Sequence, residues 1–324
     1  ELISHNRGNP FLKTRKTQVL IIGGGITGTG LARDLALRGV QSVLVEQYDI
    51  NAGASGSNHG LLHSGARYVA NDPSAARDCK EEGDILKHLG PNCIEKTVGL
   101  FVAVEGDDEW FVSDFPSKCA ACGIPTHSVD VKTAREMEPS LSEKLIAAYH
   151  VEDATIDPFK LSLENIWQAQ ELGSTLLRGT KAVRFQHRGK RIESVTLSET
   201  MTGNETLLEV DQVVNAAGAW SREVALMADI PIEMVYSKGT LLVTLNRITK
   251  HVVNRLRPPS NADILVPGGT VSLLGTTSVK VESPYGVYPT VEEVDIIVEE
   301  EAAMVPELET TRYIRAYSGV RPLV

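Results

Sequence analysis

One short segment constrains the fold more than any other: a glycine motif that follows an apolar strand and opens a helix. Residues 17–22 (TQVLII) are nearly all apolar, which is typical of a strand buried on both faces of a parallel sheet. Glycines in the spacing Gly-x-Gly-x-x-Gly follow at 23–28, and apolar side chains recur at helical spacing over 26–38. A strand at 42–46 completes the unit, whose right-handed crossover makes the sheet parallel. We therefore expect an α/β fold with a Rossmann-like domain.

The spacing of these glycines is typical of a dinucleotide site. Gly23 allows a tight turn, Gly25 lets the backbone approach a pyrophosphate, and Gly28 lets the helix pack closely on the strand. Amides at the helix N-terminus attract phosphate charge, and Glu46 ends the second strand, where it can accept hydrogen bonds from a ribose. A glycine-rich structural turn is the alternative. The same motif serves both NAD and FAD.

Two further segments favour FAD. Residues 52–68 (AGASGSNHGLLHSGARY) are too rich in small polar residues for a core helix and could follow a long cofactor closely. A flexible surface loop, the alternative, would not explain the embedded leucine pair or the paired His63 and Arg67. Residues 213–220 (VVNAAGAW) read as a buried strand that ends in small residues, where a sheet edge could again meet the nucleotide.

Charge and hydropathy exclude other classes. The chain carries 32 Lys and Arg against 42 Asp and Glu, and this net charge of -10 opposes binding to nucleic acid. No uncharged apolar run approaches the ~18 residues needed to cross a bilayer, and residues 1–16 lack an apolar signal core. We expect a cytoplasmic protein with no membrane span of its own.

The cysteines predict no metal centre. Only Cys119 and Cys122 have a suggestive spacing, and a zinc site would need a second such pair. We interpret the four cysteines as buried or half-buried thiols, with a labile or metal-binding pair as the alternative.

The pattern of the chain changes after residue 174, where alternation of period two predicts antiparallel strands. The expected division is a flexible arm at 1–16, a discontinuous FAD-binding domain at 17–105 and 145–228, a helical insertion at 106–144, an inserted, mainly antiparallel α+β substrate domain at 229–310, and a return strand at 311–324.

Several motifs together carry a resemblance to a known family. They are the glycine motif, SGSNHGLLHSGARY at 55–68, DP at 157–158, VVNAAGAW at 213–220, DILVP at 263–267 and YSGVRPL at 317–323. In these motifs the chain resembles the FAD-dependent glycerol-3-phosphate dehydrogenases of the D-amino-acid-oxidase-like flavoprotein superfamily, most closely the large, flavin-carrying chain of the anaerobic enzyme. Members of that family continue past ArgProLeu with a Gly-Gly-Lys segment, and the anaerobic type adds a cysteine-bearing tail. We therefore expect the C-terminal remainder to be missing.

The resemblance implies bound FAD. The residues that it places along the cofactor are Gly23, Gly25, Ile26, Thr27, Gly28, Glu46, Gln47, Ser55, Ser57, Asn58, His59, Gly60, Leu61, Leu62, Val183, Ala217, Gly218 and Trp220.

The resemblance also places Arg67, Tyr68 and Arg321 around the substrate. We expect Arg321 and His63 to be the catalytic residues, with His63 as a candidate base. A phosphate monoester carries about two charges near neutral pH, and arginine forks match its oxygens. Each residue has an alternative interpretation. The arginines could be surface ion-pair residues, and His63 could be a hydrogen-bonded core histidine.

The activity implied is oxidation of sn-glycerol 3-phosphate to dihydroxyacetone phosphate, with hydride passing from C2 to flavin N5 while a base takes the hydroxyl proton. Electrons would leave through partner subunits to a membrane quinone, which would make the protein peripheral at the inner face of the cell membrane. A flavin amine or amino-acid oxidase, in which an arginine pairs with a carboxylate, is one alternative. A non-catalytic FAD-binding subunit is another.

Two charged features are interpreted as solvated. Lys238, in SKGT, is typical of a turn lysine. The glutamates of the helix expected at 291–304 predict an exposed helix face; they are Glu292, Glu293, Glu299, Glu300 and Glu301.

Overall fold

The strand that precedes the glycine motif lies inside a mixed sheet. The computed structural model describes residues 16–323, so the expected arm at 1–16 lies outside the described residues except for Lys16. In sheet order the strands are β10 (Thr180–Arg188), β11 (Arg191–Glu199), β12 (Glu205–Asn215), β1 (Lys16–Ile22), β2 (Ser42–Glu46) and β9 (Thr175–Arg178). β1 pairs in parallel with both β12 and β2, and β9 pairs in parallel with β2, whereas β10 and β11 extend the sheet antiparallel.

Alternate side chains of β1 enter two different cores, as expected for a strand buried on both faces. Val19 and Ile21 pack with residues of α1 (Ile26–Leu37) and α5 (Pro158–Glu171). Leu20 and Ile22 pack on the other face, where α6 (Ser221–Leu226) contributes Val224. The strand-helix-strand unit that the sequence predicts is confirmed.

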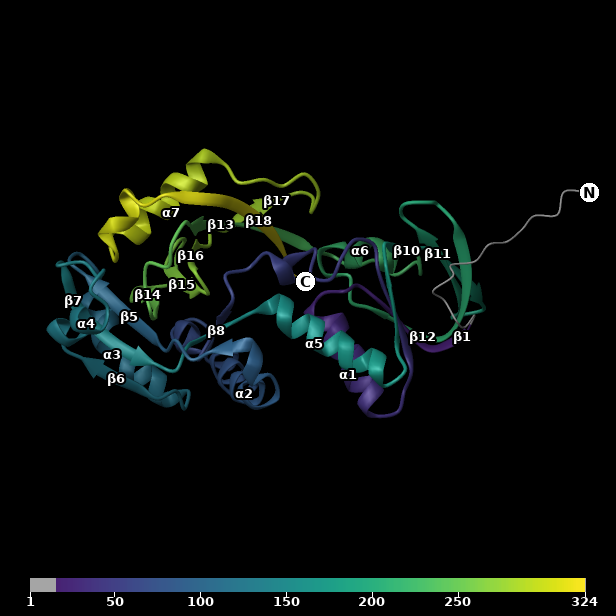
Figure 1. Cartoon of the computed structure of the whole chain (residues 1–324), viewed down its shortest axis with the longest axis horizontal. Coiled ribbons are helices and arrows are strands. Elements are labelled where there is room, and N and C mark those ends of the chain that lie inside the picture. Colours follow the sequence, from purple (N-terminus) through teal and green to yellow (C-terminus); the bar gives the residue numbers. More distant parts are fainter. Residues whose placement is uncertain (1–15, 324) are drawn as a thin grey trace, which may run out of the picture.

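The second lobe is built on a larger sheet, and Figure 1 shows the two lobes side by side with the C-terminus between them. Its path is β17 (Val279–Val281), β13 (Val235–Thr244), β16 (Val271–Gly275), β15 (Ile264–Gly268), β14 (Val252–Arg255), β5 (Gly99–Val104), β7 (Leu145–Val151) and β6 (Thr126–Val129). β18 (Tyr313–Leu323) pairs along almost all of β13 and brings the end of the chain back between the lobes (Figure 1).

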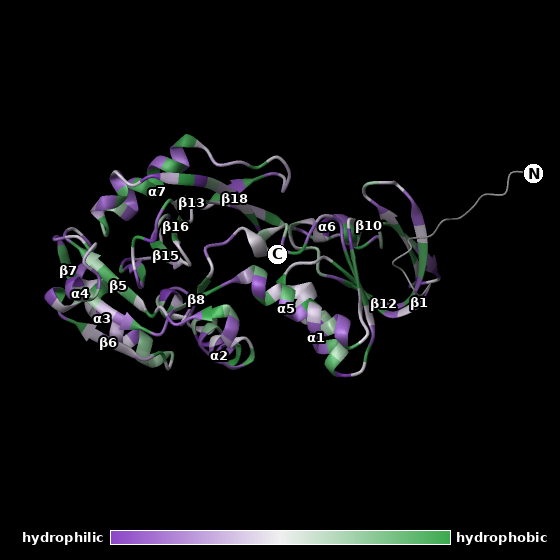
Figure 2. Ribbon diagram, in the orientation of Figure 1, coloured by the Kyte–Doolittle hydropathy of each residue, from purple (hydrophilic) through white to green (hydrophobic). Residues whose placement is uncertain are grey.

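Helices cover this sheet. Apolar side chains of α4 (Val131–Met137) and of α7 (Val291–Ala302) pack into one core with strands β5, β13 and β15. Those of α3 (Glu109–Ala121) pack into another. Figure 2 shows apolar and polar residues alternating along α7 and α5, which is typical of helices with one buried face.

The sheets do not follow the domain boundaries expected at 105 and 145. β5 and β7 belong to the larger sheet, and the expected helical insertion contains β6, which pairs with β7. β5 is apolar and buried at every position, so its sequence is compatible with either sheet.

A small sheet of β3 (Leu61–Leu62), β8 (Ala154–Ile156) and β4 (Ile94–Glu95) lies beside α2 (Pro73–Leu89), at the junction of the lobes in Figure 1. Over residues 16–323, every helix falls short of the length and apolar character that a membrane crossing requires.

Candidate functional site

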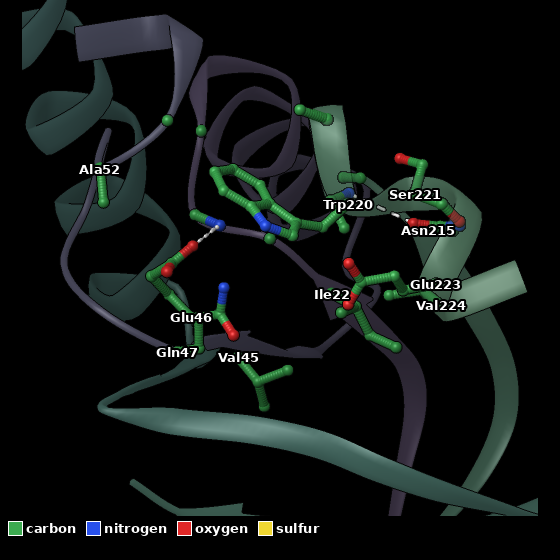
Figure 3. A pocket seen from close by; sticks show the side chains of 18 of the residues that line it. Ile22, Val45, Glu46, Gln47, Ala52, Asn215, Trp220, Ser221, Glu223 and Val224 are labelled. Atoms are coloured by element: carbon green, nitrogen blue, oxygen red, sulfur yellow. Dashed lines mark hydrogen bonds between the residues drawn. The ribbon is translucent and has the colours of Figure 1, made fainter. Parts of the chain in front are cut away.

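A cavity of about 350 Å³ opens at the carboxyl ends of β1 and β2. Its walls come from the glycine motif, from the ends of β2 and β12, and from the turn η1 (Ala54–Gly56). Figure 3 shows Glu46 and Gln47 on one side of this cavity, Glu223 and Val224 on another, and the indole of Trp220 between them. This is the edge of a parallel sheet where nucleotides bind in doubly wound folds.

The three glycines have different roles. Gly23 has a φ of +117°, and a Cβ there would lie 2.3 Å from the Ala216 carbonyl oxygen. A Cβ on Gly28 would lie 1.9 Å from the Gly23 carbonyl oxygen, so Gly28 lets α1 pack against the turn. A Cβ on Gly25 would instead point toward Ser55, 3.0 Å from its Oγ. Gly25 is the N-cap of α1 and lines the cavity.

The carboxylate of Glu46 stabilises the same turn. Its Oε2 accepts a hydrogen bond of 2.8 Å from the Gly24 amide, drawn in Figure 3, and its Oε1 accepts one of 2.8 Å from the Tyr48 amide. Each carboxylate oxygen has a further acceptor position. Glu46 can therefore also accept the hydroxyls of a ribose in the cavity.

These features fit FAD. A glycine-lined wall at a helix N-terminus suits a pyrophosphate, and an acceptor at the end of the second strand suits the ribose. The predicted cofactor residues that line this cavity are Gly23, Gly25, Thr27, Glu46, Gln47, Ser55, Ala217, Gly218 and Trp220.

Other predicted cofactor residues lie elsewhere. Ser57, Asn58 and His59 line a second cavity, whereas Ile26, Gly28, Gly60, Leu61, Leu62 and Val183 line neither. On β10 the residues that line the first cavity are Thr180, Lys181 and Ala182, and a break in strand register separates Ala182 from Arg184. That local irregularity has no clear signal in the sequence.

The second cavity, of about 610 Å³, adjoins the first. Ala54 lines both, and β18 runs between them with alternating side chains: Pro322 faces the first cavity, whereas Arg321 and Leu323 face the second. Both cavities thus meet at η1 and β18. The second cavity gathers the predicted substrate and catalytic residues, which are His63, Arg67, Tyr68 and Arg321.

Within residues 16–323, the hydrogen-bond partners of Arg321 are all neutral groups. Its guanidinium donates to the Thr276 hydroxyl and, at 3.3 Å from both Nη atoms, to the Thr277 carbonyl oxygen. Gly239 lies directly beneath it, and a Cβ there would be 2.6 Å from Nη2. Burial lowers the pKa of Arg321 from its usual value. Gly239 lies within the motif SKGT, whose sequence carries no signal of this close approach.

Arg67 is ion-paired. Its Nη2 lies 3.0 Å from Oδ2 of Asp263 and 3.1 Å from the Ser260 carbonyl oxygen. Asp263 is fully buried and also accepts a hydrogen bond of 2.8 Å from Arg257 Nε. In the sequence, Asp263 is the first residue of the motif DILVP. Its pairing with Arg67, 196 positions earlier, had no local signal.

His59, His63 and Tyr68 form a row of rings on the cavity wall. The centroids of His59 and His63 are 6.0 Å apart, and those of His63 and Tyr68 are 5.3 Å apart. Burial, together with the charge of Arg67, lowers the pKa of His63 to about 4. Burial and the charges of His63, Arg67 and Arg321 lower the pKa of His59 to about 3. Both imidazoles are therefore neutral near pH 7.

Two of the expectations about charged residues are wrong. Lys238 is buried, and its Nζ lies 2.7 Å from Oε2 of Glu293 on α7. Glu293 and Glu301 are buried, whereas Glu292 and Glu299 are exposed as predicted. The helix therefore carries acidic residues on both faces. The two buried glutamates are stabilised by hydrogen bonds from Lys238 in β13 and from the Gly275 amide in β16.

The cysteines are free thiols in the structure. Cys93, Cys119 and Cys122 are buried and Cys79 is half-buried. Burial is the main cause that raises the pKa of Cys119 to about 11, so this thiol stays protonated at neutral pH.

Comparison with known proteins also indicates a protein that uses FAD. The chain is 45% identical over 320 residues to the A subunit of anaerobic glycerol-3-phosphate dehydrogenase from Escherichia coli (strain K12), covering 97% of this chain and 59% of that protein. It thus spans about three fifths of that relative's length. The crystal structure of L-proline dehydrogenase from P. horikoshii has a TM-score of 0.80 at 22% identity, covering 94% of this chain and 81% of that one.

The glycerol-3-phosphate dehydrogenase from Bacillus halodurans complexed with FAD has a TM-score of 0.74 at 23% identity, covering 95% of this chain and 57% of that one. At such identities these structures establish the fold alone. Residues 18–324 match the family described as FAD dependent oxidoreductase. The glycine-lined cavity and the match over nearly the whole sequence lead to one conclusion: this chain belongs to the FAD dependent oxidoreductase family.

Proposed function

We propose that the protein oxidises sn-glycerol 3-phosphate to dihydroxyacetone phosphate, with FAD in the first cavity and the substrate in the second. The observation that carries the proposal is that two arginines, Arg67 and Arg321, face one cavity next to the nucleotide site. Guanidinium groups bind phosphate oxygens through paired N–H donors. In a chain with a net charge of -10, such a local concentration of positive groups favours an anionic substrate.

The FAD contacts would come mainly from the first cavity. The glycine turn and the N-terminus of α1 would hold the pyrophosphate, and Glu46 would accept the ribose hydroxyls. The flavin end would lie toward η1 and β18, where the cavities meet. When bound, FAD supplies the two-electron oxidation, since it accepts a hydride.

His63 would act as the base. A neutral imidazole can take the proton of the substrate C2 hydroxyl as hydride leaves C2, which turns the alcohol into a ketone. The pKa of His63, lowered to about 4 by burial and by Arg67, keeps this ring unprotonated before the substrate binds. Arg321 and Arg67 would hold the phosphate and so fix C2 relative to the cofactor.

We also propose that the electrons pass to a quinone through other subunits, with the protein peripheral at the inner face of the cell membrane. The 45% identical relative is named as one subunit of its enzyme, which supports an assembly of more than one chain.

A second candidate is oxidation of an amino acid. The positive charge of Arg67 is compensated by Asp263, so Arg321 is left as the one cation of this cavity, among described residues, without an acidic partner. One free arginine suffices for a carboxylate. A phosphate substrate requires that Arg67 also contribute.

The test is spectroscopic. The FAD-loaded protein is mixed anaerobically with glycerol 3-phosphate, glycerol or glycine, and the visible absorbance of oxidised flavin is followed. The proposal expects bleaching by glycerol 3-phosphate only. Bleaching by glycine would favour the second candidate, and bound flavin that no substrate reduces would indicate a non-catalytic subunit.

A further inference from the structure

The acidic helix α7 has two buried glutamates on the face that meets the second lobe's sheet. Glu293 is 4% exposed and Glu301 is fully buried, whereas Glu292 and Glu299 point to solvent. Burying a carboxyl group is costly unless it is hydrogen-bonded, so each buried glutamate needs specific partners. Their partners lie in β13 and in the segment at 275–277, which begins at the last residue of β16.

Glu293 is bound from several sides. Its Oε1 accepts a hydrogen bond of 2.9 Å from the Thr277 hydroxyl, and its Oε2 accepts one of 2.7 Å from Lys238 Nζ. Thr290, the N-cap of α7, adds bonds of 3.0 Å from its amide and its hydroxyl. Burial raises the pKa of Glu293, but the hydrogen bonds that it accepts, foremost those from Lys238 and Thr277, together outweigh this and leave that pKa below its usual value. Glu293 is thus an anion that fixes the Thr277 side chain.

Glu301, two turns further along α7, holds the start of the same segment. Its Oε1 accepts a hydrogen bond of 2.7 Å from the Gly275 amide. Thr277 is also tied to β13, because its hydroxyl accepts a bond of 3.0 Å from the Thr240 amide. Segment 275–277 is therefore anchored at both ends.

The anchored segment supplies all the hydrogen-bond partners that the structure gives to the Arg321 guanidinium. These are the Thr276 hydroxyl and the Thr277 carbonyl oxygen. On its other side the guanidinium lies against the backbone at Gly239. Because Arg321 has no carboxylate partner in the described part of the chain, its orientation depends on this neutral segment.

We propose that Glu293, paired with Lys238, and Glu301 are positioning residues that hold segment 275–277 so that Arg321 faces the second cavity for anion binding. This rests on the proposed function, in which Arg321 binds the substrate phosphate. α7 then sets the anion affinity of a cavity that it does not line.

The experiment removes the hydroxyl that joins the segment to Glu293 and to the Thr240 amide, without disturbing a charge. Thr277→Val deletes the hydroxyl but keeps the shape of the side chain and the Lys238–Glu293 pair, and Thr277→Ser restores the hydroxyl. The matched control on α7 is Glu299→Gln, whose side chain is exposed. Glu300 is unsuitable as a control because it pairs with Arg257 at 2.8 Å.

The probe is inorganic phosphate, and its binding to the FAD-loaded protein is measured by calorimetry alongside the melting temperature. Thr277→Val is expected to weaken phosphate binding about threefold to tenfold, the size of a single hydrogen bond at Arg321 that is no longer well oriented, while Thr277→Ser and Glu299→Gln bind as the wild type does. With glycerol 3-phosphate, KM should rise while kcat changes little.

Unchanged phosphate affinity in folded Thr277→Val, whatever its melting temperature, would overturn the inference, and so would failure of Thr277→Ser to restore binding. If Thr277→Val does not fold, the double variant Lys238→Met with Glu293→Gln removes both charges together and is expected to weaken phosphate binding in the same way. Arg321→Met separates the two proposals. If it leaves phosphate binding unchanged, the proposed function fails; if it weakens binding while Thr277→Val does not, only the positioning role fails.

Discussion

Arg67 and Asp263 form an ion pair of 3.0 Å between Nη2 and Oδ2, in which the aspartate is completely buried. Asp263 also pairs with Arg257, so one carboxylate serves two guanidinium groups. Arg321, in the same cavity as Arg67, donates to one hydroxyl and one carbonyl oxygen and has no acidic partner among the residues that the structure describes. The two predicted phosphate ligands are therefore electrostatically unequal.

This inequality predicts unequal effects of substitution. Each contact of an arginine with a phosphate contributes about 1.5–3 kcal/mol, which corresponds to a loss of roughly 10- to 150-fold in kcat/KM when it is removed. We expect Arg321→Ala to reach the upper part of this range with glycerol 3-phosphate and Arg67→Ala the lower part, because Asp263 already compensates Arg67. Steady-state kinetics check this, with plain glycerol as the substrate that lacks the phosphate. Equal proportional losses with both substrates would contradict the phosphate contact.

The glycines of the motif should separate cofactor binding from folding. Gly25→Val puts a branched side chain into the cavity wall, so FAD binding should be lost while the fold survives. Gly28→Ala places a Cβ 1.9 Å from the Gly23 carbonyl oxygen, so it should lower the melting temperature of the apoprotein by forcing α1 away from the turn. Flavin content after heat release and apoprotein melting curves distinguish the two. Stoichiometric flavin in Gly25→Val would show that this loop does not hold the pyrophosphate.

His63 predicts a pH-dependent stability. Its pKa, lowered by burial and by Arg67 to about 4, lies below the value of 6.5 for a free histidine. As the pH falls from 6.5 toward 4, the unfolded chain takes up a proton that the folded protein does not bind, and stability decreases. His63→Asn should therefore lose less stability than the wild type over this range in urea unfolding. Parallel curves for wild type and His63→Asn would refute the interpretation.

The raised pKa of Glu301 predicts that the free energy of unfolding depends on pH in the opposite direction. Burial raises the pKa of this carboxyl well above its usual value, and its Oε2 is buried with no hydrogen-bond partner among the described residues. Above pH 4.5 the unfolded chain releases a proton that the folded protein keeps, so stability decreases with rising pH by up to ~1.4 kcal/mol per pH unit. Glu301→Gln keeps an acceptor for the Gly275 amide and does not ionise. The free energy of unfolding of Glu301→Gln, relative to that of the wild type, should increase from pH 4.5 to 7. If this difference stays constant over the range, Glu301 is ionised in the folded protein.

The sequence by itself determined the nucleotide-binding half of this protein. The strand, the glycine turn, the helix and Glu46 lie within the 31 residues 16–46, so contacts between residues close in the sequence are enough to form this unit. The grouping of Arg67, Tyr68 and Arg321 came from the resemblance, and the structure brings these residues to one cavity.

Only the tertiary structure decided which charges are compensated. The contacts of Asp263 with Arg67, and of Glu293 with Lys238 and Thr277, join residues that lie 16 to 196 positions apart in the sequence. Strand pairing and helix packing bring these residues together. Nothing in the sequence of an acidic helix distinguishes a buried glutamate from an exposed one. Burial depends on which face of α7 meets the sheet, and there the cost of burial is offset by donors from other segments. The tertiary structure likewise decided that β5 and β7 belong to the larger sheet. The sequence of an apolar strand does not determine which strands it pairs with.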